Sequence, residues 1–251
     1  MSENKTEKVP FGKSDGFRRF KLALKRLSGR EPRLNIDLRL PLQSFGVWQV
    51  CPDLLPAGGV VYSLGVGEDI DFDLAMIQAK KMEVHAFDPT PNSVEWLKRQ
   101  EMPAGFHFHP WAVADKDGSF FLYPRLLRDG TPSTTMFTLL AESVDREGGV
   151  EVPAKTIARI MKSLRHDHVD VLKMDIEGAE YGVLDGLLAS EIRPGQLLIE
   201  FHHRHAGLHK AQTVKAIADL RTAGYALIDI SSTGREFAFV LESALKKSGR
   251  Q

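Results

Sequence analysis

The sequence predicts an α/β fold built on a mostly parallel sheet, because short apolar runs typical of strands alternate with helical patterns. The clearest run begins the stretch Val169–Glu180, which reads VDVLKMDIEGAE. Its first half is nearly continuous in apolar residues, as expected of a strand buried on both faces, and Gly178 marks the turn into a helix. A second strand, Val60–Leu64, is followed directly by a Gly-x-Gly turn and a helical pattern. Together these observations predict a doubly wound α/β architecture.

The composition is that of an ordinary globular protein. Of the 251 residues, 43% are hydrophobic and 26% are charged, and the formal net charge is zero, so no nucleic-acid partner is expected. One cysteine excludes an intramolecular disulfide framework. The N-terminus lacks the apolar core of a signal peptide, and no apolar run reaches about 18 residues. We therefore expect a cytoplasmic protein without a transmembrane segment.

Two regions are predicted, a basic extension over residues 1–57 and a main α/β domain over residues 58–251. Residues 1–40 hold eleven Lys/Arg and five Asp/Glu. Ser14 and Asp15 can cap a helix over residues 16–27, whose apolar side chains fall on one face (Phe17, Phe20, Leu24 and Leu27). The favoured interpretation is a helix that packs this face on the core. The alternative is contact with a membrane surface or another anionic partner. Residues 28–59 are predicted to be irregular.

The Gly-x-Gly turn and the next strand predict a nucleotide site. Gly65 and Gly67 allow the backbone to turn tightly and to approach a ligand. The strand Glu83–Phe87 ends in Asp88, about twenty residues after the glycines, where an acidic side chain holds ribose hydroxyls in this type of fold. The alternative is that Asp88 only caps its own turn.

The charges near the turn favour a cationic nucleoside over a dinucleotide. A dinucleotide fingerprint requires a third glycine where this chain has Ile70. The neighbouring side chains are acidic and would repel a pyrophosphate at the helix N-terminus (Glu68, Asp69, Asp71 and Asp73). S-adenosylmethionine carries a sulfonium and an ammonium and no phosphate. We therefore expect it, rather than NAD, as the cofactor.

The remaining elements complete the predicted sheet. Residues 106–114 are expected to form a third strand whose end, at Ala112, lies beside the adenine. Residues 125–151 are polar and too long for a simple connection, which is typical of a lid or binding loop. A strand over 196–201 precedes a helix over 210–223. Residues 225–230 and 236–241 then form a hairpin, which adds one antiparallel strand.

Four segments together resemble the FkbM-type family of S-adenosylmethionine-dependent methyltransferases and its methyltransferase-like relatives. They are SLGVGEDIDFD at 63–73, VHAFDPTP at 84–91, LKMDIEGAEYGVL at 172–184 and LLIEFHH at 197–203. The resemblance spans residues 58–241. It implies a seven-stranded class I methyltransferase fold with the last strand antiparallel, and transfer of methyl groups mostly to hydroxyl oxygens.

The resemblance also implies roles for individual residues. Gly65 and Gly67 would approach the amino-acid part of the cofactor, and Asp88 its ribose. The broader pattern has an acid where this chain has Ser63 and a third glycine where it has Asp69. Contacts to the methionine part are therefore expected from Glu68 or Asp69 instead.

Three side chains at neighbouring strand ends are the candidates for catalysis: Asp175, Glu200 and His202. A hydroxyl nucleophile must lose a proton, so a base or a metal ion near the acceptor should help. In one hypothesis Asp175 and Glu200 bind Mg²⁺, which lowers the pKa of the acceptor. In the other, no metal takes part and His202 is the general base. A purely structural alternative pairs Glu200 with an arginine and bonds His202 or His203 to the backbone.

Two other classes of function remain open at this point. One is a nucleotide-dependent oxidoreductase of the NAD type, which Ile70 and the acidic turn disfavour. The other is a non-catalytic module that binds S-adenosylmethionine. The acceptor itself is left open among hydroxyls of sugars, glycans, lipids and natural products.

Overall fold

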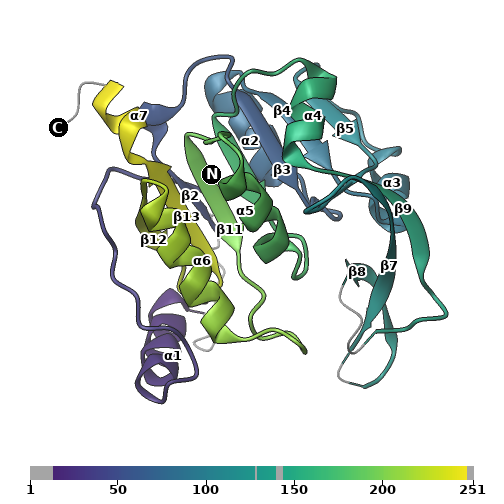
Figure 1. The fold of residues 1–251 in the computed structure, drawn as a ribbon, viewed down its shortest axis with the longest axis horizontal. Coiled ribbons are helices and arrows are strands. Elements are labelled where there is room, and N and C mark those ends of the chain that lie inside the picture. The colour runs from purple at the N-terminus through teal and green to yellow at the C-terminus, as the bar shows by residue number, and fades with distance from the viewer. Residues whose placement is uncertain (1–13, 128, 140–143, 248–251) are drawn as a thin grey trace, which may run out of the picture.

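The computed structural model describes residues 14–127, 129–139 and 144–247. Its centre is a seven-stranded sheet with the strand order β12–β13–β11–β10–β3–β4–β5 (Figure 1). The strands are β3 (Val60–Leu64), β4 (Glu83–Phe87), β5 (Phe106–His109), β10 (Val171–Met174), β11 (Gln196–Glu200), β12 (Tyr225–Ile230) and β13 (Glu236–Leu241). All neighbours pair in parallel except β13, which is antiparallel to both β11 and β12. The predicted fold class and the antiparallel last strand are confirmed.

Helices cover both faces of this sheet. The helices α4 (Ile157–Leu164), α5 (Glu180–Ala189) and α6 (Lys210–Thr222) pack their apolar residues on one face, where α5 and α6 lie in front of the strands in Figure 1. The helices α2 (Asp71–Lys80) and α3 (Pro91–Leu97) pack on the other face. The strands are buried on both sides, which explains why β10 and β11 read as apolar runs without alternation.

The segment before β3 is more ordered than the sequence predicted. It contains a hairpin of β1 (Gln43–Phe45) and β2 (Trp48–Val50) and a short 3-10 helix η2 (Pro52–Leu54). The hairpin packs on the α2 face, where Trp48 and Phe45 meet Phe72 edge to face. Gln196 then bonds both the N–H and the C=O of Cys51, at 2.8 and 3.0 Å. The prediction of an irregular segment is wrong here, because the aromatic side chains of the hairpin complete the core.

A second, four-stranded sheet with the order β6–β9–β7–β8 lies beside the first. Its strands are β6 (Ala112–Val113), β7 (Gly118–Leu126), β8 (Pro132–Thr138) and β9 (Val150–Lys155). The predicted third strand over 106–114 is therefore divided at Pro110, and its second part belongs to this sheet. The stretch 125–151 was predicted as a loop, but β8 and the start of β9 lie within it; residues 128 and 140–143 are outside the described part.

Two helices flank the core at the ends of the chain. Ser14 caps α1 (Asp15–Leu27), as predicted, by accepting a hydrogen bond from the N–H of Phe17. Helix α7 (Glu242–Lys247) continues from β13 and was not predicted. Among the described residues, none of these helices has the length and apolar character needed to cross a bilayer.

Candidate functional site

A cavity of about 650 Å³ opens at the carboxyl ends of β3, β4, β10 and β11. This is the position at which open α/β sheets bind their ligands. The turn after β3 and the hairpin β1–β2 form part of its wall, and the strands β7 and β8 contribute apolar side chains such as Leu122, Met136 and Phe137. Every residue predicted to contact the cofactor lines this cavity: Gly65, Gly67, Glu68, Asp69, Asp88 and Ala112.

The two glycines of the turn serve different physical needs. Gly65 has φ +74°, and a Cβ there would lie 1.8 Å from the carbonyl oxygen of Asp175. Its lack of a side chain therefore lets the ends of β3 and β10 approach each other. Gly67 has φ +55°, and a Cβ there would meet nothing within 4 Å. The backbone at Gly67 is thus open, as close approach of a ligand requires.

Asp88 is buried and holds the glycine turn in place. One carboxylate oxygen accepts hydrogen bonds from the N–H groups of Val66 and Gly67, at 3.2 and 2.8 Å. The other accepts from the N–H and the hydroxyl of Thr90, at 2.9 and 2.8 Å. Asp88 therefore caps its own turn and also lines the cavity. Binding of a ribose by Asp88 stays a prediction, since a carboxylate has further acceptor positions.

The described lining of the cavity is strongly acidic. It contains seven carboxylates and a single lysine, Lys173. The carboxylates are Glu68, Asp69, Asp71, Asp88, Asp175, Glu177 and Glu200. Lys173 is buried, donates to the carbonyl of Gly65 at 3.0 Å and lies 5.3 Å from the ring of Trp48. The remaining excess of negative charge fits a cationic ligand and opposes a phosphate.

The three candidate catalytic residues converge as strand alternation predicted. Because β10 and β11 are adjacent and parallel, with Met174 opposite Ile199, the residues that follow them meet at one end of the sheet. The Nε2 atom of His202 lies 3.6 Å from a carboxylate oxygen of Asp175 and 3.7 Å from one of Glu200. His203 points elsewhere and contacts Glu31 and Thr213.

His202 carries a positive charge at neutral pH. Burial alone would lower its pKa, but the nearby carboxylates outweigh burial and raise the pKa to about 9, with Glu180 contributing most. Glu180 is fully buried and receives the Nδ1 hydrogen bond of His202 at 2.8 Å. It also accepts from the N–H groups of Ile176 and Gly178. Glu180 therefore fixes the orientation of the imidazole.

Glu200 is poised to exchange a proton near neutral pH. Burial and the neighbouring Asp175 raise the pKa of Glu200 to about 7, against the opposing effect of Arg235, which lies 3.0 Å away. Burial also raises the pKa of Asp175. The purely structural alternative expected Glu200 to pair with an arginine, and it does. The same alternative expected His202 or His203 to bond the backbone, but His202 bonds the carboxylate of Glu180.

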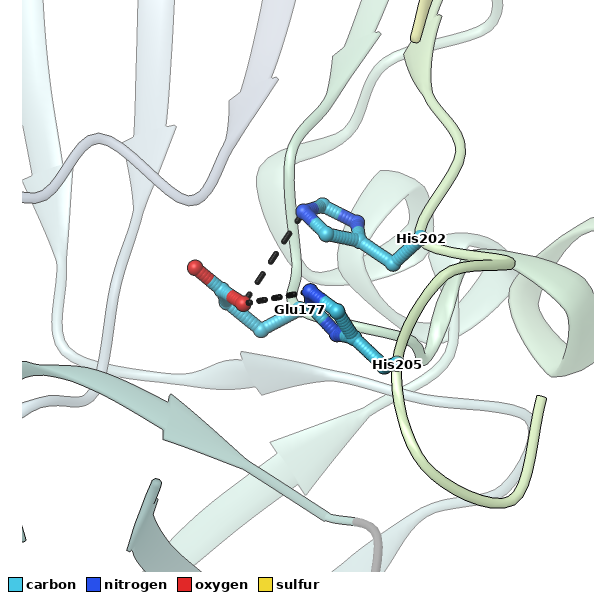
Figure 2. A group of neighbouring side chains, drawn as sticks. All are labelled: Glu177, His202 and His205. Atoms are coloured by element: carbon cyan, nitrogen blue, oxygen red, sulfur yellow. Dashed lines mark ion pairs between the residues drawn. The ribbon is translucent and has the colours of Figure 1, made fainter. Parts of the chain in front are cut away.

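A second group forms around Glu177 (Figure 2). The imidazoles of His202 and His205 both point toward its carboxylate, at 3.9 and 3.8 Å. The carboxylate also pairs with Arg125 of β7 at 2.7 Å. Glu177 has φ +52°, a left-handed conformation that costs about 1–2 kcal/mol for a residue with a Cβ. Such strain is typical of functional sites, because the surrounding structure must hold the residue in place.

The donor atoms of both groups could hold a metal ion. Those of Asp175, Glu200 and His202 lie within 4.8 Å of one another, and so do those of Glu177, His202 and His205. The first group contains the pair proposed for Mg²⁺, with an imidazole added. Mg²⁺ prefers oxygen ligands, so only the two carboxylates of that group suit it.

Sequence reasoning missed two contributors to this site, Arg125 and His205. Arg125 comes from a segment that the sequence assigned to a polar loop. His205 lies beyond the strand, where alternation no longer predicts orientation. Sequence reasoning also gave Glu180 no role, although it lies in the first turn of α5, where its carboxylate bonds the backbone at the end of β10.

Comparison with known proteins identifies the family of this chain. The family described as "Methyltransferase FkbM domain" matches residues 60–227. The curated "Probable methyltransferase-like protein 24" of Homo sapiens and that of Rattus norvegicus are each 28% identical over 145 residues, which is 57% of this chain and 32% of the relative. The chain thus matches about a third of the length of these relatives.

Solved structures show a more distant likeness. The methyltransferase FkbM from Methylobacillus flagellatus KT is 15% identical with a TM-score of 0.47, over 74% of this chain and 44% of that chain. Fibrillarin from Aeropyrum pernix, in complex with S-adenosyl-L-methionine, is 11% identical with a TM-score of 0.39, over 74% of this chain and 67% of that chain. Since the family match covers most of the described domain, this chain belongs to the FkbM methyltransferase family.

Proposed function

We propose that the protein is an S-adenosylmethionine-dependent methyltransferase that transfers a methyl group to a hydroxyl oxygen of a sugar, glycan, lipid or natural product. The observation that carries the proposal is the acidic cavity at the glycine turn, with one lysine among seven carboxylates in its described lining. A sulfonium and an ammonium are stabilised there, and the pyrophosphate of NAD is repelled. The alternative of an NAD-type oxidoreductase is therefore disfavoured.

The bound cofactor would supply an electrophilic methyl group on sulfur. Methyl transfer forms a carbon–oxygen bond to the acceptor, breaks the carbon–sulfur bond and releases the hydroxyl proton. The residues must hold the acceptor oxygen about 3 Å from the methyl carbon and in line with the sulfur. Asp175 and Glu200 line the cavity at the ends of adjacent strands, and in this proposal they orient the acceptor hydroxyl.

The proton is best received by Glu200. Its pKa of about 7 leaves a large fraction ionised at neutral pH and still lets it bind a proton. His202 is already protonated, so it stabilises the neighbouring carboxylates instead of acting first as the base. In the alternative version, Asp175 and Glu200 would hold Mg²⁺, which acidifies an acceptor hydroxyl.

Calorimetry with S-adenosylhomocysteine, S-adenosylmethionine and NAD tests the cofactor. We expect both adenosyl compounds to bind and NAD not to bind. The variant Asp88→Ala should weaken binding at least tenfold, since it releases the N–H groups of Val66 and Gly67 and removes the proposed ribose acceptor. If the adenosyl compounds do not bind, the methyl-donor proposal fails; if NAD alone binds, the oxidoreductase is favoured.

Transfer of a radiolabelled methyl group to lysate and glycan extracts tests the reaction. The variants Asp175→Asn and His202→Ala should lose turnover by about a hundredfold or more and keep their affinity for S-adenosylhomocysteine within a few fold. Loss of activity with a chelator, restored by Mg²⁺, would support the metal-dependent version; unchanged activity would support proton transfer to Glu200. Wild-type turnover in both variants would remove Asp175 and His202 from the mechanism.

A further inference from the structure

Helix α1 presents its apolar face to the outside. The helix forms as predicted, but the interpretation that this face packs on the core is wrong. Phe20, Leu24 and Leu27 are 59%, 50% and 69% exposed, whereas Leu22, on the opposite side, is buried. At 100° per residue, Phe17, Phe20, Leu24 and Leu27 form one stripe, which we call the apolar stripe.

Several contacts hold the helix in this orientation. Leu22 packs against the turn at Gly234, where a Cβ would come within 2.5 Å of its side chain. Arg33 donates to the carbonyls of Arg26 and Leu27 and so caps the last turn. Lys210 at the start of α6 donates to the carbonyl of Gly29. Rolling the apolar stripe inward would break these contacts, so its exposure follows from the fold.

Basic side chains accompany the apolar stripe. Arg18, Lys21 and Lys25 lie along one of its edges, and Lys21 sits 4.5 Å from the centre of the Phe17 ring. The only acid of the helix, Asp15, is already paired with Arg19 at 2.9 Å. An exposed apolar stripe with a cationic edge is the pattern of helices that lie in the interface of a membrane.

A cavity of about 570 Å³ lies between α1 and the end of β12. Its charged lining is Arg19, Arg26 and Arg33 with Asp229, and the rest is mostly aliphatic. Within the described residues, the buried Nε of Arg26 has no hydrogen-bond partner. Guanidinium groups above aliphatic walls match a phosphate carried by an apolar chain.

We propose that α1 docks the protein on an anionic membrane, with its apolar stripe among the acyl chains and a phospholipid phosphate in the cavity of Arg19, Arg26 and Arg33. Two complementary features support a lipid over an acidic protein surface. The apolar stripe is convex and borne on a single helix, and the cationic cavity has aliphatic walls. Apolar burial and attraction to anionic lipid add together in such helices, and neither suffices alone.

Sedimentation of the full chain with vesicles tests the proposal. We expect binding to phosphatidylcholine vesicles that contain phosphatidylserine, little binding to phosphatidylcholine alone, and weakening at higher salt. Leu24→Glu should reduce partitioning by about tenfold or more, since it places a charge among acyl chains. Val214→Glu is the matched control, because Val214 is 44% exposed and belongs to another helix, α6. It should bind as the wild type does.

Further variants and a competition experiment distinguish a membrane from the other possible ligands of α1. Arg26→Gln should also weaken vesicle binding, and inorganic phosphate should not displace the protein from vesicles. If Arg26→Gln weakened vesicle binding and Leu24→Glu left it unchanged, the cavity would be a site for a soluble anion and the membrane proposal would be overturned. The membrane proposal would also be overturned if the protein bound neither kind of vesicle. It would be overturned as well if the protein associated with itself and Leu24→Glu abolished that association. Affinity for S-adenosylhomocysteine should stay unchanged in all of these variants, so this test is independent of the proposed methyl transfer.

Discussion

The His202 imidazole is surrounded by carboxylates, so its charge is coupled to theirs. The ion pairs with Glu180, Asp175 and Glu200 hold a proton on His202 to a pH well above the ordinary range of histidine. A cation formed by the protein itself thus lies beside the two carboxylates proposed for Mg²⁺. Glu200 nevertheless has a pKa of about 7, because burial and Asp175 raise it more than Arg235 and His202 lower it.

The raised pKa of His202 makes folding stability depend on pH. Its pKa is about 9 in the folded protein against an ordinary value of 6.5, so its contribution is fully present below pH 6.5 and is lost as the pH rises through 9. The difference corresponds to about 3 kcal/mol. In urea unfolding from pH 7 to pH 9, the wild type should lose stability, and His202→Gln should lose much less.

The exposed His107 offers a control for this experiment. His107→Gln should retain the wild-type slope, because its ring lies on the edge strand β5, where it meets Glu83 in solvent. Equal slopes in the wild type and His202→Gln would show that His202 is not protonated in the folded protein.

Among the residues of the site, those at the carboxyl ends of strands could be predicted from the sequence. Those that come from other segments could not. Asp175, Glu200 and His202 could be grouped because alternation and strand adjacency fix their direction. Arg125 could not be grouped with them, since its distance from Glu177 depends on how a second sheet packs against the first. The proposed roles of the grouped residues stay predictions until turnover is measured.

At the scale of the elements, the turn Leu64–Gly67 follows β3 and joins it to the end of the neighbouring strand β10. It approaches the end of β10 so closely that the carbonyl of Asp175 occupies the place of a Cβ on Gly65. The contact positions the glycine backbone and the end of β10 at Asp175 relative to each other. In the proposed function, the same turn would therefore contact the cofactor and also help to position the acceptor.

Gly65→Ala should destabilise the protein far more than Gly58→Ala. The two glycines have nearly the same φ, +74° and +71°. Placing an alanine in this left-handed conformation costs about 1 kcal/mol at either position. Only at Gly65 would the added Cβ collide with backbone atoms, since a Cβ at Gly58 would meet nothing within 4 Å. We expect an additional loss of several kcal/mol for Gly65→Ala in urea unfolding. Equal losses would show that β3 and β10 can separate at little cost.

Elements with strong apolar patterns were predictable, and short or polar ones were not. The strands β12 and β13 have the predicted bounds because both lie in the core. The hairpin β1–β2 and the strand β8 were missed although their pairing partners lie close in the sequence. The strands β1 and β2 have only three residues each and β8 is mostly polar, so none of them carries a clear apolar pattern. The amphipathic pattern of α1 predicted a helix correctly, but such a pattern does not state whether protein or another apolar phase covers the face.

At the scale of the whole molecule, the edge of the main sheet carries a cluster of imidazoles, from which we predict a dependence of stability on pH in acid. His85 of β4 and His109 of β5 are 3.0 Å apart between ring nitrogens, and their rings are stacked. His166 contacts the hydroxyl of Tyr62 at 2.8 Å beside them. Burial, followed by the neighbouring imidazoles, lowers the pKa of His85 to about 3; burial and nearby cations lower that of His109 to about 4.

The protein should therefore lose stability as the pH falls from 6.5 toward 4. The lowered pKa values mean that the unfolded chain binds protons which the folded chain excludes, so the stability from these groups is present above pH 6.5 and lost below it. His85→Phe keeps an aromatic ring and should make the loss of melting temperature shallower. His209→Asn, at the exposed N-cap of α6, should follow the wild type. A wild-type slope in His85→Phe would contradict a role for the cluster.

Glu31 belongs to the extension, yet its buried carboxylate pairs with His203 at 3.0 Å and with Arg204 at 2.7 Å, immediately after His202. A shortened protein that began at residue 60, where the family match starts, would leave both side chains without their anion. The segment that follows His202 would then lose two of the contacts that hold it in place. Such a fragment would also lack the hairpin β1–β2, whose Phe45 and Trp48 belong to the core, so it should be both less stable and a poor enzyme, and adding the missing piece back as a separate peptide should restore turnover.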